Sequence, residues 1–207
     1  MLDEMKVKEF IKELASNSPA PGGGSVACVN GAMAAGLGAM VCRLTIGKEI
    51  YKDVEDLFKE KLPKLDKLHA ELTELIDKDA NAFNGVMASF KMPKDTDEQI
   101  IARSKKIQEE YKKAALVPMS TARACKKVLD IILELGTQGN KNAVSDIAVG
   151  ALNALTGLKS AILNVQINLP SIKDETFKSE TRIEIEEMLK GADEKVQNLI
   201  DAAKSQF

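Results

Sequence analysis

The sequence predicts an all-α fold, a single-domain bundle of long helices that covers residues 1–207. Apolar residues recur at spacings of three and four along almost every segment, which is the period of an amphipathic helix. Alternating runs of Val, Ile and Thr between hairpin turns, the pattern of strands, are missing. Hydrophobic residues make up 44% of the chain, which is enough for a sizeable core, and no linker is long enough to separate two domains.

The first half of the chain is expected to contain three helices. An amphipathic helix over residues 3–16 is ended by two prolines and three glycines in residues 16–24. A second helix follows over residues 25–45. After a break at residues 47–53, a long charged helix extends to about residue 90, and Pro63 is expected to kink or split it.

The second half is expected to contain three more helices. Thr96, followed by two acidic residues and Gln99, is a capping-box signal that opens a helix at residue 97. This helix is expected to bend near Pro118 and to end by residue 136. Residues 136–142 form a loop, residues 143–168 a helix stopped by Pro170, and residues 174–207 a last charged helix.

Composition argues against several classes of partner. The 29 basic and 31 acidic residues leave a formal charge of -2, so the chain has no general attraction to nucleic acid. Aromatic residues make up only 4% and Trp is missing, which leaves few rings for stacking on bases or for a membrane interface. The mixed charges of the first residues differ from a signal peptide, and Arg43 and Lys48 close the one long stretch of small residues. A cytoplasmic protein that does not span a membrane is expected.

Cysteine and histidine usage predicts reduced thiols and catalysis without a metal. Cys28, Cys42 and Cys125 are an odd set without CxxC spacing, and they are expected in the core. His69 is the only histidine, and no cluster of His, Cys and carboxylates has metal-ligand spacing. We therefore expect no metal and no cofactor.

Two helices carry unusual stripes of residues separated by three or four positions. Small residues follow one face of the second helix, which indicates a close-packed core or dimer seam more strongly than ligand contact. A polar stripe follows one face of the otherwise apolar helix at residues 143–168, where it either forms an internal hydrogen-bond network or lines a binding site. The small stripe is Gly24, Cys28, Gly31, Ala35, Gly38 and Cys42, and the polar stripe is Asp146, Gly150, Asn153, Gly157, Ser160, Asn164 and Asn168.

The segment Ser-Pro-Ala-Pro-Gly-Gly-Gly-Ser at residues 18–25 lies between two predicted helices. Its glycines permit close approach of a ligand, and the free amides at the start of the next helix attract a carboxylate or phosphate. A connector capped by Ser25 is an equally good interpretation of the composition. The segment is not a Walker loop, because no strand precedes it and the Gly-Lys-Ser/Thr ending is missing.

Five short sequence motifs together resemble the formiminotetrahydrofolate cyclodeaminase and methenyltetrahydrofolate cyclohydrolase family, and the resemblance runs from end to end. The motifs are SPAPGGGSVA at 18–27, LTIGK at 44–48, DKDANAF at 77–83, GNKNAVSD at 139–146 and NVQIN at 164–168. The resemblance implies a homodimeric helical bundle that binds a reduced folate, with the glycine loop and the polar stripe lining one pocket. It also implies that helix amides and Lys48 hold the anionic glutamate tail of the folate.

The resemblance implies two reactions, both of which need a base and an acid. One is hydrolysis of 5,10-methenyltetrahydrofolate to 10-formyltetrahydrofolate, and the other is closure of 5-formiminotetrahydrofolate to the methenyl compound with release of ammonia. Candidate catalytic residues are Asp146, Asp79 and Lys48. Candidate substrate-binding residues are Ser18, Pro21, Gly22, Gly23, Gly24, Ser25, Tyr51, Phe83, Asn140, Asn142, Ser145, Asn153, Asn164 and Asn168.

Each catalytic candidate also has a structural interpretation. Asp146 either acts as general base and cation stabiliser or satisfies free amides at a helix start. Asp79 and Phe83 either present a carboxylate beside a ring that packs on the folate, or are an exposed acid beside a core residue. Lys48 is also expected at a helix end for dipole reasons alone. Alternatives to an enzyme are a folate-binding module without turnover and a structural dimerisation bundle.

Overall fold

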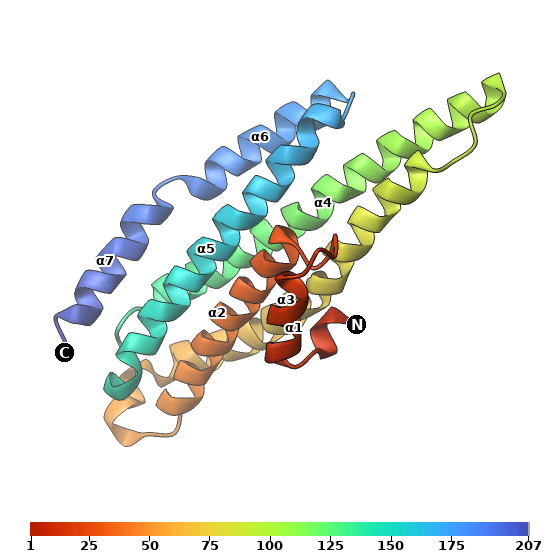
Figure 1. Ribbon diagram of the computed structural model, residues 1–207. Coiled ribbons are helices and arrows are strands. Elements are labelled where there is room, and N and C mark those ends of the chain that lie inside the picture. The colour runs from red at the N-terminus through yellow and green to blue at the C-terminus, as the bar shows by residue number, and fades with distance from the viewer. Residues whose placement is uncertain (207) are drawn as a thin grey trace.

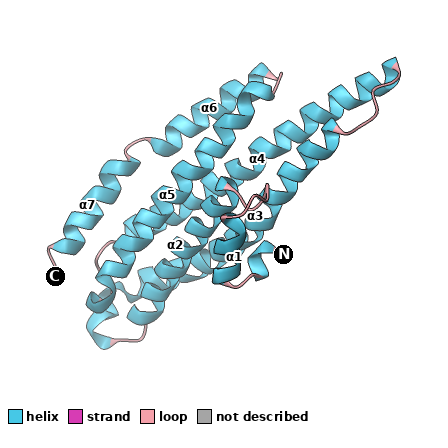
Figure 2. Ribbon diagram, in the orientation of Figure 1, coloured by secondary structure: helices cyan, strands magenta, loops and turns pink. Residues whose placement is uncertain are grey.

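The computed structural model describes residues 1–206, which form helices joined by short loops without any strand (Figures 1 and 2). Four long helices make the bundle, and the shorter helices lie outside it. The long helices are α2 (Gly23–Thr45), α3 (Glu55–Phe90), α4 (Asp97–Leu135) and α5 (Val144–Asn168). The shorter ones are α1 (Val7–Leu14), α6 (Glu175–Leu189) and α7 (Ala192–Lys204), with 3-10 turns at Leu2–Glu4, Glu49–Val54, Lys141–Ala143 and Leu169–Ser171. The all-α fold class is confirmed.

The core lies where α2 packs against α3 and α5, and where α4 packs against the same two helices. The small residues of α2 permit this close packing. A Cβ on Gly31 would lie 2.6 Å from the sulfur of Cys125, and a Cβ on Gly38 would lie 3.1 Å from Leu65. The core-packing interpretation of this stripe is therefore confirmed for residues 28–42, whereas Gly24 at its start lines a pocket.

The cysteines share this core. All three are free and buried. Burial raises the pKa of the Cys28 and Cys125 thiols to about 12 and that of Cys42 to about 11, which keeps them protonated and unreactive.

Several expected boundaries are corrected. Pro63 lies inside α3 without splitting it, and α4 continues through Pro118 as expected. The last helix is two helices, because Gly191 adopts a left-handed conformation with φ of 68° that favours glycine. Thr96 does cap α4, since its side chain accepts a hydrogen bond from the Gln99 amide at 3.3 Å. The first helix begins only at Val7.

Two segments, Gly23–Thr45 and Lys141–Ser171, are long and apolar enough by length and composition to cross a membrane. This corrects the expectation that Arg43 and Lys48 keep the apolar stretch too short. At least half of each apolar window is buried. The two helices pack against each other and against α3 and α4, which is typical of core helices in a globular bundle. The cytoplasmic location stays a prediction.

Candidate functional site

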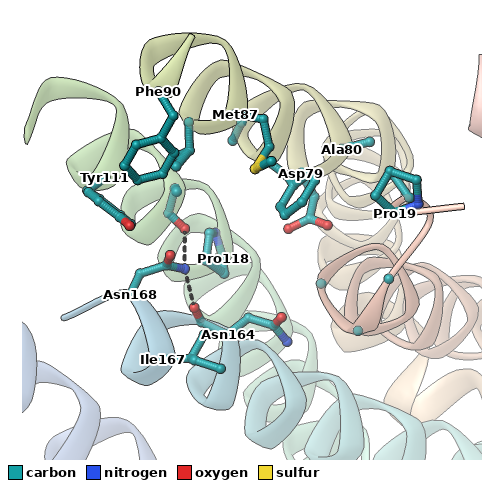
Figure 3. Close-up of a pocket in the computed structure, with 18 residues that line it drawn as sticks. Pro19, Asp79, Ala80, Met87, Phe90, Tyr111, Pro118, Asn164, Ile167 and Asn168 are labelled. Atoms are coloured by element: carbon teal, nitrogen blue, oxygen red, sulfur yellow. Dashed lines mark hydrogen bonds between the residues drawn. The ribbon is translucent and has the colours of Figure 1, made fainter. Parts of the chain in front are cut away.

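A pocket of about 420 Å³ lies between the glycine-rich loop and helices α3, α4 and α5 (Figure 3). Its volume falls within the range of roughly 300–1,000 Å³ that is common for small-molecule sites. The residues that line it are Pro19, Ala20, Gly22, Gly23, Gly24, Asp79, Ala80, Ala82, Phe83, Val86, Met87, Phe90, Tyr111, Ala114, Pro118, Asn164, Ile167 and Asn168.

Asp79 is the carboxylate of this pocket, and its side chain reaches the first turn of α2. The hydroxyl of Ser25 donates a hydrogen bond to Oδ2 of Asp79 at 3.1 Å. Gly24 must lack a side chain here, because a Cβ would lie 2.0 Å from Oδ1 of Asp79. The start of α2 therefore already holds an anion that belongs to the chain itself, and a second anion from a ligand would be repelled there.

The environment of Asp79 favours its protonated form more than water does. Burial raises the pKa of the Asp79 carboxyl, and the hydrogen bonds from Ser25 offset part of this effect. A half-buried carboxyl with a raised pKa that faces a pocket is a good general acid or base, because it can exchange a proton nearer to neutral pH.

Two asparagines of α5 form the polar side of the pocket. The side-chain nitrogen of Asn164 donates to the backbone carbonyl of Ser160 at 2.8 Å. The side-chain nitrogen of Asn168 donates to the backbone carbonyls of Asn164 at 2.8 Å and of Ala114 at 3.1 Å. The hydrogen-bond-network interpretation of the polar stripe is confirmed at this end of α5, and the binding-site interpretation stays a prediction for side chains that line a pocket. The side-chain nitrogens belong to an internal network. The side-chain oxygens are left to accept hydrogen bonds from a ligand in the pocket.

The opposite side of the pocket is apolar. Phe83, Met87 and Phe90 are 41%, 44% and 42% exposed, although large apolar side chains usually avoid such exposure. The rings of Phe90 and Tyr111 meet edge to face, with their centroids 6.1 Å apart, at the end of the pocket farthest from Pro19 and Asp79 (Figure 3). A long ligand with a flat apolar middle suits this surface.

Phe90, Met87 and Tyr111 were not among the expected site residues. The sequence does carry a signal for the first two, because Asp79, Phe83, Met87 and Phe90 follow one another at helical spacing along α3. Tyr111 has no such signal, since only the packing of α4 against α3 brings it to the pocket.

Other expected site residues lie elsewhere. Ser18 hydrogen-bonds the carboxylate of Glu13, and the buried Pro21 does not line the pocket. A second group lies at the other end of the bundle, where Asn140 donates to the carbonyl of Leu44 at 2.9 Å, and the Tyr51 hydroxyl accepts from the amide of Lys141 at 3.0 Å. This group contains Lys48, Tyr51, Asn140, Asn142, Ser145 and Asp146.

The two groups of expected residues do not meet within one chain. Asp146 is in the first turn of α5 and Asn164 is eighteen residues later, so they are about 27 Å apart along the helix. Asn153 lies between them, and its amide nitrogen donates to the Val149 carbonyl at 3.0 Å. The polar stripe of α5 therefore links the two ends of the molecule.

Comparison with known proteins gives consistent relatives. A model of the family described as formiminotransferase-cyclodeaminase matches residues 6–187. A methenyltetrahydrofolate cyclohydrolase of Methylorubrum extorquens is 41% identical over 96% of this chain and 96% of its own length. A formimidoyltransferase-cyclodeaminase of Rattus norvegicus is 34% identical over 91% of this chain, which spans only 35% of that protein. The crystal structure of a formiminotetrahydrofolate cyclodeaminase from Thermotoga maritima superposes with a TM-score of 0.80 at 30% identity, over 100% of this chain and 97% of that one.

Proposed function

Because this chain belongs to the formiminotransferase-cyclodeaminase family, we propose that it is an enzyme of folate one-carbon metabolism that acts at the pocket beside Asp79. The reactions are hydrolysis of 5,10-methenyltetrahydrofolate to 10-formyltetrahydrofolate, and closure of 5-formiminotetrahydrofolate to the methenyl compound with loss of ammonia. The full-length cyclohydrolase relative favours hydrolysis as the main activity. The observation that carries the proposal is a half-buried carboxyl with a raised pKa at one end of a long apolar pocket.

The chemistry of hydrolysis suits this carboxylate. The methenyl carbon between N5 and N10 is electron-poor and cationic, so the negative charge of Asp79 stabilises it. Asp79 then accepts a proton from the attacking water, and the tetrahedral adduct breaks its bond to N5 as that nitrogen takes up a proton. In the deaminase direction, N10 attacks the formimino carbon and the same carboxyl returns a proton to the departing ammonia. Neither reaction requires a metal or an organic cofactor.

The protein is proposed to act as a homodimer, with α2 and α5 at the interface. These neighbouring helices carry several exposed large apolar side chains, and exposed apolar faces favour interaction surfaces. Ile167 also lines the pocket, which places the pocket at the edge of this face. The exposed apolar residues are Met33, Met40 and Leu44 of α2, and Val149, Leu152, Leu163 and Ile167 of α5.

A symmetric dimer also gives the second group of expected residues a role. If two α5 helices cross antiparallel near their centres, Asp146 of the partner subunit approaches Asn164 and the pocket. We propose that Asp146 and Lys48 act in catalysis in this way, from the subunit opposite the Asp79 that they assist. The distance between the two groups within one chain supports this arrangement.

The activity is tested by the loss of the methenyl chromophore on mixing with 5,10-methenyltetrahydrofolate. Turnover bleaches the absorbance, a binding module preserves it while binding the ligand, and a structural bundle leaves the ligand free. The rate is expected to persist after treatment with EDTA, and a loss that zinc reverses would contradict the metal-free mechanism. A parallel assay with 5-formiminotetrahydrofolate ranks the two reactions.

The shared site is tested by subunit complementation. Asp79→Asn and Asp146→Asn should each lower turnover by roughly 10²-fold. Refolding the two variants together makes mixed dimers with one intact site, so roughly a quarter of wild-type activity should return. No recovery, with dimers present by light scattering, would place both carboxylates in one chain's site or remove Asp146 from the mechanism. Leu163→Glu, which puts a charge on the apolar face, is expected to produce monomers.

A further inference from the structure

Arg103 of α4 lies beside Phe90, a residue that lines the pocket, although Arg103 itself is not a lining residue. Its guanidinium carbon is 5.9 Å from the centre of the Phe90 ring, and Nη2 donates a hydrogen bond to the Phe90 carbonyl at 3.1 Å. The Nε atom is buried without a hydrogen-bond partner. Among residues 1–206, no carboxylate forms an ion pair with Arg103. The contact with Phe90 therefore leaves this cation, next to a residue of the pocket wall, with unused hydrogen-bonding capacity.

The pocket has opposite charges at its two ends. Asp79 supplies the negative charge at the end formed by the glycine-rich loop. Residues 91–106, which are the turn between α3 and α4 and the start of α4, carry five basic and three acidic residues. Arg103 is the basic residue in contact with the pocket wall. An elongated ligand with one anionic end is therefore oriented with that end toward Arg103 and away from Asp79.

The dimensions fit a folate placed in this direction. Asp79 and Phe90 are eleven residues apart on α3, which corresponds to about 16 Å. This length accommodates the pterin and the benzoyl ring. Tyr111 and Arg103 are eight residues apart on α4, or about 12 Å. Both contact Phe90, whose ring centre is 6.1 Å from the centre of the Tyr111 ring and 5.9 Å from the guanidinium carbon of Arg103. The glutamate of a folate extends beyond the benzoyl ring by a comparable distance.

We propose that Arg103 binds a carboxylate of the folate glutamate and so fixes the orientation of the substrate, with its one-carbon unit beside Asp79. This rests on the proposed function, and it reassigns the anionic tail from Lys48 and the amides of the glycine loop. Arg103 is a binding residue that sets substrate position, because guanidinium forks hold carboxylates through paired hydrogen bonds.

The test compares two stable ligands, folic acid and pteroic acid, which differ only by the glutamate. Dissociation constants are measured by calorimetry for the wild type, Arg103→Ala, Arg103→Lys and the control Lys105→Ala. Lys105 is an exposed cation of the same helix, and its removal subtracts the same charge. The wild type and Lys105→Ala should prefer folic acid by about tenfold or more, because a charge-assisted pair contributes at least this much. Arg103→Ala should bind both ligands with the affinity that the wild type has for pteroic acid. Arg103→Lys should keep part of the preference for folic acid.

Each other outcome overturns the proposal in a distinct way. If Arg103→Ala still prefers folic acid, another residue holds the glutamate. If the wild type binds both ligands equally, the glutamate is not recognised, and the folate function stands. If the wild type binds neither ligand and does not bleach methenyltetrahydrofolate, the proposed function itself fails. If the role of Arg103 is purely structural, Arg103→Ala should melt at a lower temperature and bind both ligands more weakly. The ratio of its two dissociation constants should then equal that of the wild type.

Discussion

Gly24→Ala should disable the proposed catalytic carboxylate without unfolding the protein. A Cβ at residue 24 would lie 2.0 Å from Oδ1 of Asp79, and ordinary contacts begin at 3.4 Å, so the carboxylate must move by about 1.4 Å. That shift breaks the 3.1 Å hydrogen bond from Ser25. Misplacing a catalytic group by about 1 Å can lower turnover by roughly 10²-fold, and we expect a loss of this size.

The stability of Gly24→Ala is expected to stay near that of the wild type. The clash is with the end of a side chain that can rotate away, and alanine favours the helix over glycine by up to about 1 kcal/mol. Gly22→Ala is the matched control, because a Cβ at residue 22 meets nothing within 4 Å and its φ of -129° suits alanine.

The assay is the initial rate of methenyl bleaching for both variants, together with a thermal melt. Near-normal turnover of folded Gly24→Ala would refute the placement of Asp79 at the reacting carbon. An equal loss in Gly22→Ala would show that the whole loop, and not the position of Asp79, controls the rate.

Two further predictions concern stability. Burial raises the pKa of Asp79, so the folded protein binds more protons than the unfolded chain between the ordinary and the raised pKa, and its stability falls as pH rises through that range. Asp79→Asn should lose this pH dependence and melt no lower than the wild type at neutral pH. A lower melting temperature of the variant at neutral pH would contradict the claim that burial of the charged Asp79 carboxylate costs stability. Gly157→Ala should lower the free energy of unfolding by about 1–3 kcal/mol, because its Cβ would lie 3.1 Å from the backbone oxygen of Ala27, which cannot rotate away. Gly36→Ala, whose Cβ would meet only His69 at 3.6 Å, should be neutral or stabilising in the same urea titration.

The fold class and most of the helices follow from the order of the amino acids alone. Period-3.6 patterning depends only on local spacing, so α2 and α5 are found within two residues of their expected limits. Packing overrides local preference at Pro63, where a split helix was one expectation and α3 continues instead. Pro63 and Pro118 each remove one backbone hydrogen bond, yet the helices continue through them because the apolar faces on both sides are buried. The expected bend at Pro118 stays a prediction.

The candidate site was partly predictable for the same reason. Asp79 and Phe83 lie one turn apart on a single helix, and the glycine loop and Asn164 belong to distinctive sequence motifs. Each could therefore be proposed as a site residue before the fold was known. Their meeting in one pocket, with Lys48 and Asp146 at the far end of the bundle, depends on how α2, α3 and α5 are packed.

The packing of the helices determines which anion the start of α2 binds and which cation lies beside the pocket wall. Free amides at a helix start predict an anion, but they do not tell whether it comes from a ligand or from the chain, and here it is Asp79. Arg103 is one of five basic residues in a charged stretch of sequence, and it contacts Phe90 because α3 and α4 run side by side. Local patterns encode helices because the interactions that form them span four residues, whereas the charge distribution of a pocket depends on side chains brought together from distant parts of the chain.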